Sequence, residues 1–69
     1  MSKKFNREAS VKDITALAEE VFGSAEKAHA WLHRNHLVLG ASPIDSLYSE
    51  DGEREVSKIL NAIAYGLAV

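Results

Sequence analysis

Residues 10–32 have the sequence SVKDITALAEEVFGSAEKAHAWL, in which apolar side chains recur at helical spacing. Positions 11, 14, 17, 18 and 21 are three or four residues apart and form one face, with charged residues between them. Phe22-Gly23 ends this predicted helix, because glycine adopts the left-handed C-terminal conformation at little cost. Ser24 is the predicted N-cap of a second helix, whose inward residues are Ala25, Ala28, Trp31 and Leu32. The stretch predicts an all-α protein.

Ser10 is the predicted N-cap of the first helix, and Asp13 completes an approximate capping box with it. The residues before Ser10 are mostly polar and include Lys3, Lys4 and Arg7. We therefore expect a mobile basic arm over residues 1–9 and a single helical domain over residues 10–69.

The helical period fails between Asn35 and Ala41, which predicts a connector whose Leu37 and Leu39 pack beneath the helices. Ser42-Pro43 opens a third, short helix, with serine as N-cap and proline at the first helical position. One face of this short helix consists of Ile44, Leu47 and Tyr48.

A fourth helix is predicted from about Gly52 to Tyr65, with Gly66 ending it. Its apolar stripe consists of Val56, Ile59, Leu60 and Ile63. The expected fold is a compact bundle of about four short helices, with Trp31 anchoring its core.

The composition restricts the class of protein further. The chain has 69 residues, no cysteine, and a formal net charge of -2. Disulfides and thiolate metal sites are excluded, and a core this small favours support from a protein partner. The acidic balance disfavours nucleic-acid binding as the main activity. No apolar run is long enough to span a membrane and none follows the N-terminal basic residues, so we expect a soluble cytoplasmic protein.

Three histidines raise the possibility of a metal site or an enzyme. His29 and His33 are four residues apart on the second predicted helix, and His36 follows shortly after it. A zinc enzyme needs a third ligand and a general base, and the HEXXH arrangement is absent. We expect exposed or helix-capping histidines, no metal, no cofactor and no catalysis.

The C-terminus differs from ordinary core sequence. Its last residues, Tyr65, Gly66, Leu67, Ala68 and Val69, carry no charged side chain. An apolar tail is difficult to bury in so small a domain and often marks a binding site for a partner. The alternative is that the tail folds back over Trp31.

Two other function classes remain open from the residues alone. One is a small transcriptional regulator that binds DNA or a transcription factor through the basic arm and the second helix, although these segments offer few cations for phosphate contacts. The other is a homodimeric scaffold with Trp31 or the stripe of the last helix at its interface.

The residues in order resemble the toxin-binding domain of Xre/MbcA/ParS-type antitoxins, over about residues 14–69. The positions that carry the resemblance are Ala18, Phe22, Gly23, Glu26, Lys27, Ala28, Trp31, Leu32, Leu39, Gly40, Ser42, Pro43, Leu47, Gly52, Val56, Leu60, Tyr65 and Gly66. Ala41 stands where the family usually has a second glycine.

This resemblance implies a bacterial antitoxin module that binds and neutralises a RES-domain toxin, an enzyme that consumes or transfers from NAD. It implies that Tyr65, Gly66, Leu67, Ala68 and Val69 lie at the toxin interface, where the last helix and tail cover the active site. The structural motif of the resemblance comprises Phe22, Gly23, Trp31, Leu32, Gly40, Ser42 and Pro43. The family usually carries an N-terminal helix-turn-helix domain, which these 69 residues do not include, so DNA-binding autoregulation is not implied.

Overall fold

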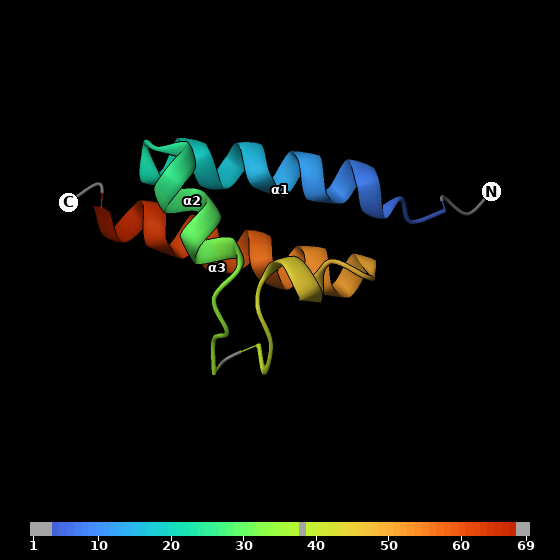
Figure 1. Ribbon diagram of the computed structural model, residues 1–69. Coiled ribbons are helices and arrows are strands. Elements are labelled where there is room, and N and C mark those ends of the chain that lie inside the picture. The colour runs from blue at the N-terminus through green and yellow to red at the C-terminus, as the bar shows by residue number, and fades with distance from the viewer. Residues whose placement is uncertain (1–3, 38, 68–69) are drawn as a thin grey trace.

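A computed structural model describes residues 4–37 and 39–67, all of them in helices or in the segments that join helices (Figure 1). The elements are α1 (Arg7–Phe22), α2 (Ala25–Leu32), a single 3-10 turn η1 (Ile44–Ser46) and α3 (Glu50–Leu67). The predicted all-α class is confirmed, with three α-helices instead of about four. The short helix expected after Pro43 is the 3-10 turn.

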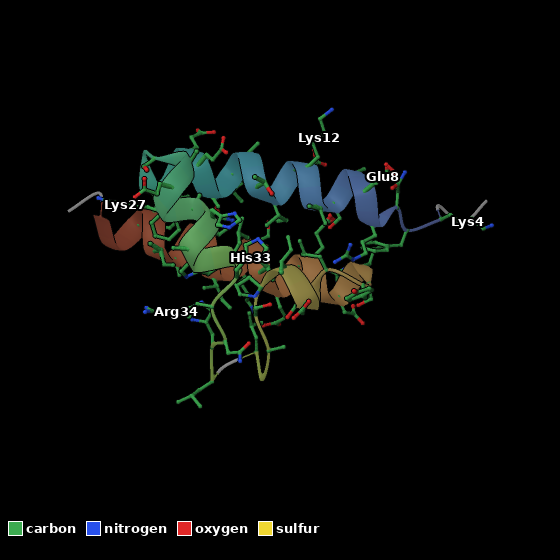
Figure 2. All side chains as sticks on the ribbon, in the orientation of Figure 1. Lys4, Glu8, Lys12, Lys27, His33 and Arg34 are labelled. Carbon is green, nitrogen blue, oxygen red and sulfur yellow. The ribbon has the colours of Figure 1, made fainter. Side chains whose placement is uncertain are left out.

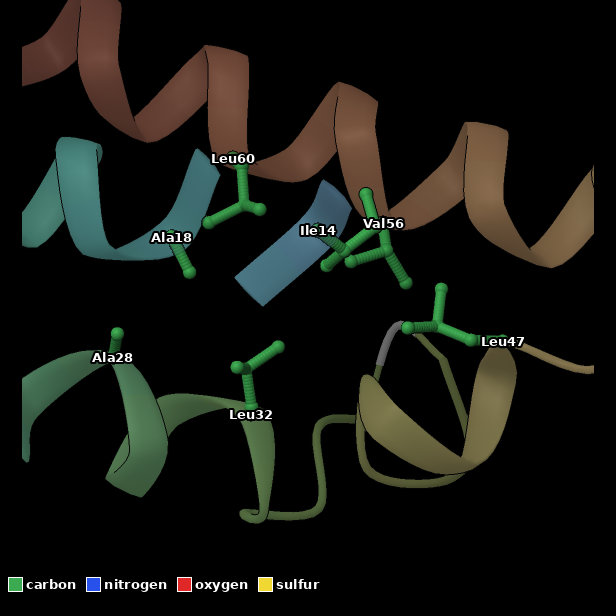
Figure 3. Close-up of a cluster of buried hydrophobic side chains, with 7 residues drawn as sticks. All are labelled: Ile14, Ala18, Ala28, Leu32, Leu47, Val56 and Leu60. Carbon is green, nitrogen blue, oxygen red and sulfur yellow. The ribbon is translucent and has the colours of Figure 1, made fainter. Parts of the chain in front are cut away.

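The core lies where α1, α2, α3 and the end of η1 meet. α1 and α3 lie side by side and run in the same direction, and α2 crosses between them and the connector (Figure 1). Figure 3 shows the buried side chains converging from the three α-helices and from the residue that follows η1: Ile14, Ala18, Ala28, Leu32, Leu47, Val56 and Leu60. Trp31 is half-buried and packs at the edge of this cluster, so the prediction that it anchors the core was wrong.

α1 begins earlier than predicted. The side chain of Asn6 accepts a hydrogen bond from the backbone N–H of Ala9 at 3.1 Å and caps the helix. Ser10 is not the N-cap; it lies one turn inside α1 and is only 2% exposed. The boundary between the predicted arm and the helix is therefore at Asn6, and Arg7 belongs to the first helical turn.

The turn between α1 and α2 forms as predicted. Gly23 has a φ of 71° and its N–H bonds to the carbonyl of Glu19 at 2.8 Å, which ends α1 in the left-handed conformation. The hydroxyl of Ser24 accepts from the backbone N–H of Lys27 at 3.3 Å and caps α2. These two adjacent signals set the corner that brings α2 back over α1.

The connector between α2 and η1 is a loop that projects away from the helices (Figure 1). The two arms of this loop meet at an isolated antiparallel bridge between His36 and Ala41. Leu39 packs against the core, as predicted. Leu37 does not: the turn directs it outward, and its side chain is 103% exposed.

Ser42 starts the next segment in the predicted manner, because its hydroxyl accepts from the backbone N–H of Asp45 at 3.3 Å. Leu47 is fully buried, whereas Tyr48 points outward and is 66% exposed. The guanidinium of Arg7 lies over the Tyr48 ring at 4.2 Å from its centroid. The prediction that Tyr48 shares the inward face was wrong. Its ring packs under the guanidinium of Arg7 instead.

α3 is longer than predicted at both ends. It begins at Glu50, after the hydroxyl of Ser49 accepts from the N–H of Gly52 at 3.1 Å. Gly66 does not end the helix, which continues through Leu67. A helical glycine costs about 1 kcal/mol relative to alanine, which does not by itself stop a helix whose preceding turns pack on the core.

Candidate functional site

The C-terminal half of α3 combines a buried apolar face with an uncharged outer face. From Ile59 to Leu67 no side chain carries a charge. Leu60 is fully buried and Ile63 is half-buried, which secures this half of the helix to the domain. Ala62, Tyr65 and Gly66 face solvent, and Tyr65 is 80% exposed. An exposed aromatic on a neutral, well-anchored helix is the composition of a protein-binding surface.

The direction of the helices places this surface at one end of the molecule. Because α1 and α3 run the same way, both helices end there (Figure 1). Neither helix has a basic residue in its own last turn to offset the partial negative charges of its final carbonyls. The first turn of α3, at the other end, carries Glu50, Asp51 and Glu53.

The predicted site residues divide into two groups. Tyr65 and Gly66 are exposed on the last turns of α3, and Leu67 is its last residue. Ala68 and Val69 lie outside the described residues. The chain up to Leu67 continues α3, so the fold-back over Trp31 is not observed in the part of the tail that the structure describes.

The motif residues of the resemblance position the helices and do not form a pocket of their own. Phe22 and Trp31 pack ring against ring, with centroids 5.8 Å apart, and hold α1 to α2 beside the Gly23 turn. Leu32 is buried in the core, and Ser42 and Pro43 are buried where the connector returns to the helices. Gly40 has a φ of 69°, which the connector turn requires.

The three histidines lie in two separate ring contacts. His29 and His33 are both exposed and stack with ring centroids 4.2 Å apart. His36 lies apart from them, against Trp31 at 5.2 Å between ring centroids. Across residues 4–37 and 39–67 no group of three histidine or carboxylate side chains is arranged to hold a metal ion.

Three of the described basic residues do not lie together. Figure 2 shows Lys4 and Lys27 at opposite ends of the molecule. Arg7 contacts the ring of Tyr48 and donates to the carbonyl of Ile44 at 3.4 Å. A DNA-binding face needs cations aligned along one side, and these three cations do not form one.

Sequence reasoning missed one exposed feature, the outward Leu37 at the tip of the connector. Its neighbour Leu39 has the same residue type and the opposite burial, so composition and spacing contain no signal that separates them. Within the described residues, no helix has the length and apolar character needed to cross a bilayer.

Residues 17–66 match the family described as the antitoxin Xre/MbcA/ParS C-terminal toxin-binding domain. The chain belongs to this family. The toxin-binding domain is also 41% identical over 54 residues to a protein named Antitoxin Xre from Pseudomonas putida. That alignment covers 77% of the domain and 34% of the relative, so the chain spans about a third of the relative's length. No solved structure matches the domain significantly. The family predicted from the ordered residue series is confirmed.

Proposed function

We propose that this toxin-binding domain binds and neutralises a RES-domain toxin, and that the C-terminal end of α3 covers the entrance to the toxin's active site. Membership of the family supports the binding of a toxin. The relative named Antitoxin Xre supports the same role. The choice of a RES-domain enzyme and the covering of its active site are the finer parts of the proposal.

The observation that carries the proposal is the neutral, exposed end of α3. Tyr65 is the largest exposed side chain there, at 80% exposure, and it projects from a helix that Leu60 anchors in the core. Aromatic side chains held on rigid elements dominate the binding energy of many interfaces. Burial of Tyr65 would also require little ordering of the backbone, because α3 is already formed.

Electrostatics support the same end. A site that takes NAD must accommodate two phosphate charges and therefore presents cations or N–H donors. The last turn of α3 has no basic residue to offset the negative end of its dipole. The negative end of the helix dipole and a positively charged NAD pocket would attract each other. This attraction favours correct docking and fast association.

The proposed mechanism is steric and needs no chemistry from the domain. The bound helix end excludes NAD from the pocket in the cytoplasm, where both proteins would act. The mechanism requires none of the domain's titratable groups to enter a reaction.

The test is inhibition of NAD consumption by a purified RES-domain toxin. We expect Tyr65→Ser to raise the inhibition constant about tenfold or more, the effect of truncating a central aromatic anchor. Removing residues 67–69 should also weaken inhibition while far-UV circular dichroism stays helical. Tyr48→Ser is the matched control, since Tyr48 is 66% exposed and contacts Arg7 at the start of α1. Full inhibition by Tyr65→Ser and by the shortened chain would refute the proposed surface.

A further inference from the structure

Two histidines lie one helical turn apart at the end of α2. The backbone N–H of His33 bonds to the carbonyl of His29 at 3.1 Å, so the helical register extends to the C-cap residue. Residues four apart project from the same side of a helix. The two imidazole rings accordingly lie against each other, with centroids 4.2 Å apart and planes tilted by 37°. The backbone of α2 therefore holds the two rings as neighbours.

The separation of the two rings suits a single metal ion. Zinc binds a histidine nitrogen at about 2.0–2.1 Å, so two nitrogens on one ion lie no more than about 4.2 Å apart. Rotation about the side-chain bonds can turn one nitrogen of each ring toward a shared ion. Both histidines are exposed, so an ion can reach them from solvent. Two histidines at this spacing on a helix are a known zinc-binding arrangement.

The surroundings of the histidine pair favour a cation. His29 and His33 line a depression between α1 and α2 together with the carboxylates of Glu19 and Glu26. Among the residues that the structure describes, no lysine or arginine lines this depression. Arg34 follows the pair in sequence, and Figure 2 shows its side chain extending away from His33. The carbonyls at the end of α2 add partial negative charge.

The pair supplies two ligands and leaves the other coordination positions to water. No third histidine or carboxylate in residues 4–37 and 39–67 is arranged to join it, and His36 packs on Trp31 instead. Imidazole ligands favour Zn²⁺, Ni²⁺ and Cu²⁺, whereas Mg²⁺ and Ca²⁺ prefer oxygen ligands. The absence of metal expected from the sequence concerned a catalytic centre with a third ligand and a general base, which is a different kind of site.

We propose that His29 and His33 chelate one divalent transition-metal ion, of the class of Zn²⁺, Ni²⁺ and Cu²⁺, at the C-terminal end of α2. The ion acts on stability. α2 has only eight residues, and the two histidines are one turn apart only when this helix is formed. An ion that binds the folded chain in preference to the unfolded chain stabilises the fold by mass action. The site shares no residue with the exposed end of α3, so it is independent of the proposed toxin contact.

Isothermal titration calorimetry of the tag-free chain with zinc chloride tests the site. We expect one Zn²⁺ per chain and no binding of Mg²⁺ at the same concentration. With free Zn²⁺ at about ten times the dissociation constant, the melting temperature should rise by about 5–10 °C, and EDTA should reverse the rise. His29→Asn should raise the Zn²⁺ dissociation constant about tenfold or more, because a single imidazole cannot chelate. His36→Asn is the matched control and should leave that constant unaltered, since it removes a histidine outside the pair.

Two double variants separate chelation from histidine content. His33→Asn combined with Ala25→His places the second histidine four residues before His29, on the same side of α2, and should restore Zn²⁺ binding. His33→Asn combined with Ala30→His places it next to His29, on a different side of the helix, and should not. Ala25 and Ala30 are both exposed, so neither change buries an imidazole. A dissociation constant weaker than about 1 mM, no effect of His29→Asn, or equal Zn²⁺ binding by the two double variants would each overturn the proposal.

Discussion

Gly52 and Gly66 both lie in α3, and the structure predicts opposite effects for the same substitution at the two positions. Alanine favours a helix over glycine by about 1 kcal/mol, so propensity alone predicts stabilisation at both. A Cβ at position 52 would overlap the backbone carbonyl of Ser46, whereas a Cβ at position 66 meets nothing within 4 Å. The overlap involves backbone on both sides, and a backbone carbonyl cannot move aside as a flexible side chain can.

The expected magnitudes follow from these two terms. Overpacking costs about 1–3 kcal/mol, and against it stands a propensity gain of at most about 1 kcal/mol in the first helical turn. Gly52→Ala should therefore lower the free energy of unfolding by up to about 3 kcal/mol, or up to about 2 kcal/mol if the full propensity gain is realised. Gly66→Ala should raise it by about 0.4–1 kcal/mol. A domain of this size has a total stability of about 3–10 kcal/mol, so both changes are measurable.

Urea denaturation, followed by Trp31 fluorescence and far-UV circular dichroism, measures both variants against the parent chain. In thermal melts, a change of 1 kcal/mol in stability shifts the melting temperature by about 4–8 °C, and the melting temperatures of the two variants should move in opposite directions. A Gly52→Ala variant as stable as the parent would show that η1 does not press on α3 as closely as the structure has it. The Gly66→Ala variant controls for helix propensity, because it makes the same chemical change in open space.

Four further stability effects are expected. Leu60→Ala should cost about 3–5 kcal/mol and leave the domain largely unfolded by circular dichroism, because Leu60 is fully buried between helices and few large core residues remain to compensate. Asn6→Ala should cost about 1 kcal/mol by loss of the α1 cap. Ser10→Ala should be neutral or stabilising, since the buried Ser10 hydroxyl has no hydrogen-bond partner; a large loss in this variant, measured by urea denaturation, would restore Ser10 to a capping role. A double-mutant cycle of Arg7→Ala and Tyr48→Ala should give a coupling of about 0.5–1 kcal/mol, and zero coupling would dismiss their cation–π contact.

The helical class and the corners were predictable because their signals are local. The Gly23–Ser24 corner and the Ser42-Pro43 start depend on backbone groups within four residues, and each forms the bond expected of it. The apolar period of α3 likewise places Val56 and Leu60 inside. The family assignment rests on the same ordered set of local signals.

The start of α1 shows where local reasoning was insufficient. Asn6 and Ser10 are both good N-caps by residue type. The earlier start puts Arg7 against the ring of Tyr48 and the carbonyl of Ile44, contacts between residues far apart in the sequence. No pattern within the first helix contains that information.

The sequence by itself determined the helices, their main turns and the uncharged character of the C-terminal end. Tertiary structure alone decided which of two similar residues is buried: Leu39 packs against the core and Leu37 is exposed, although the two are separated by one residue. It also decided that α1 and α3 run in the same direction, which gathers their C-terminal ends at one end of the molecule (Figure 1). The physical reason is that capping and periodicity act over a few residues, whereas burial depends on which distant segments pack together.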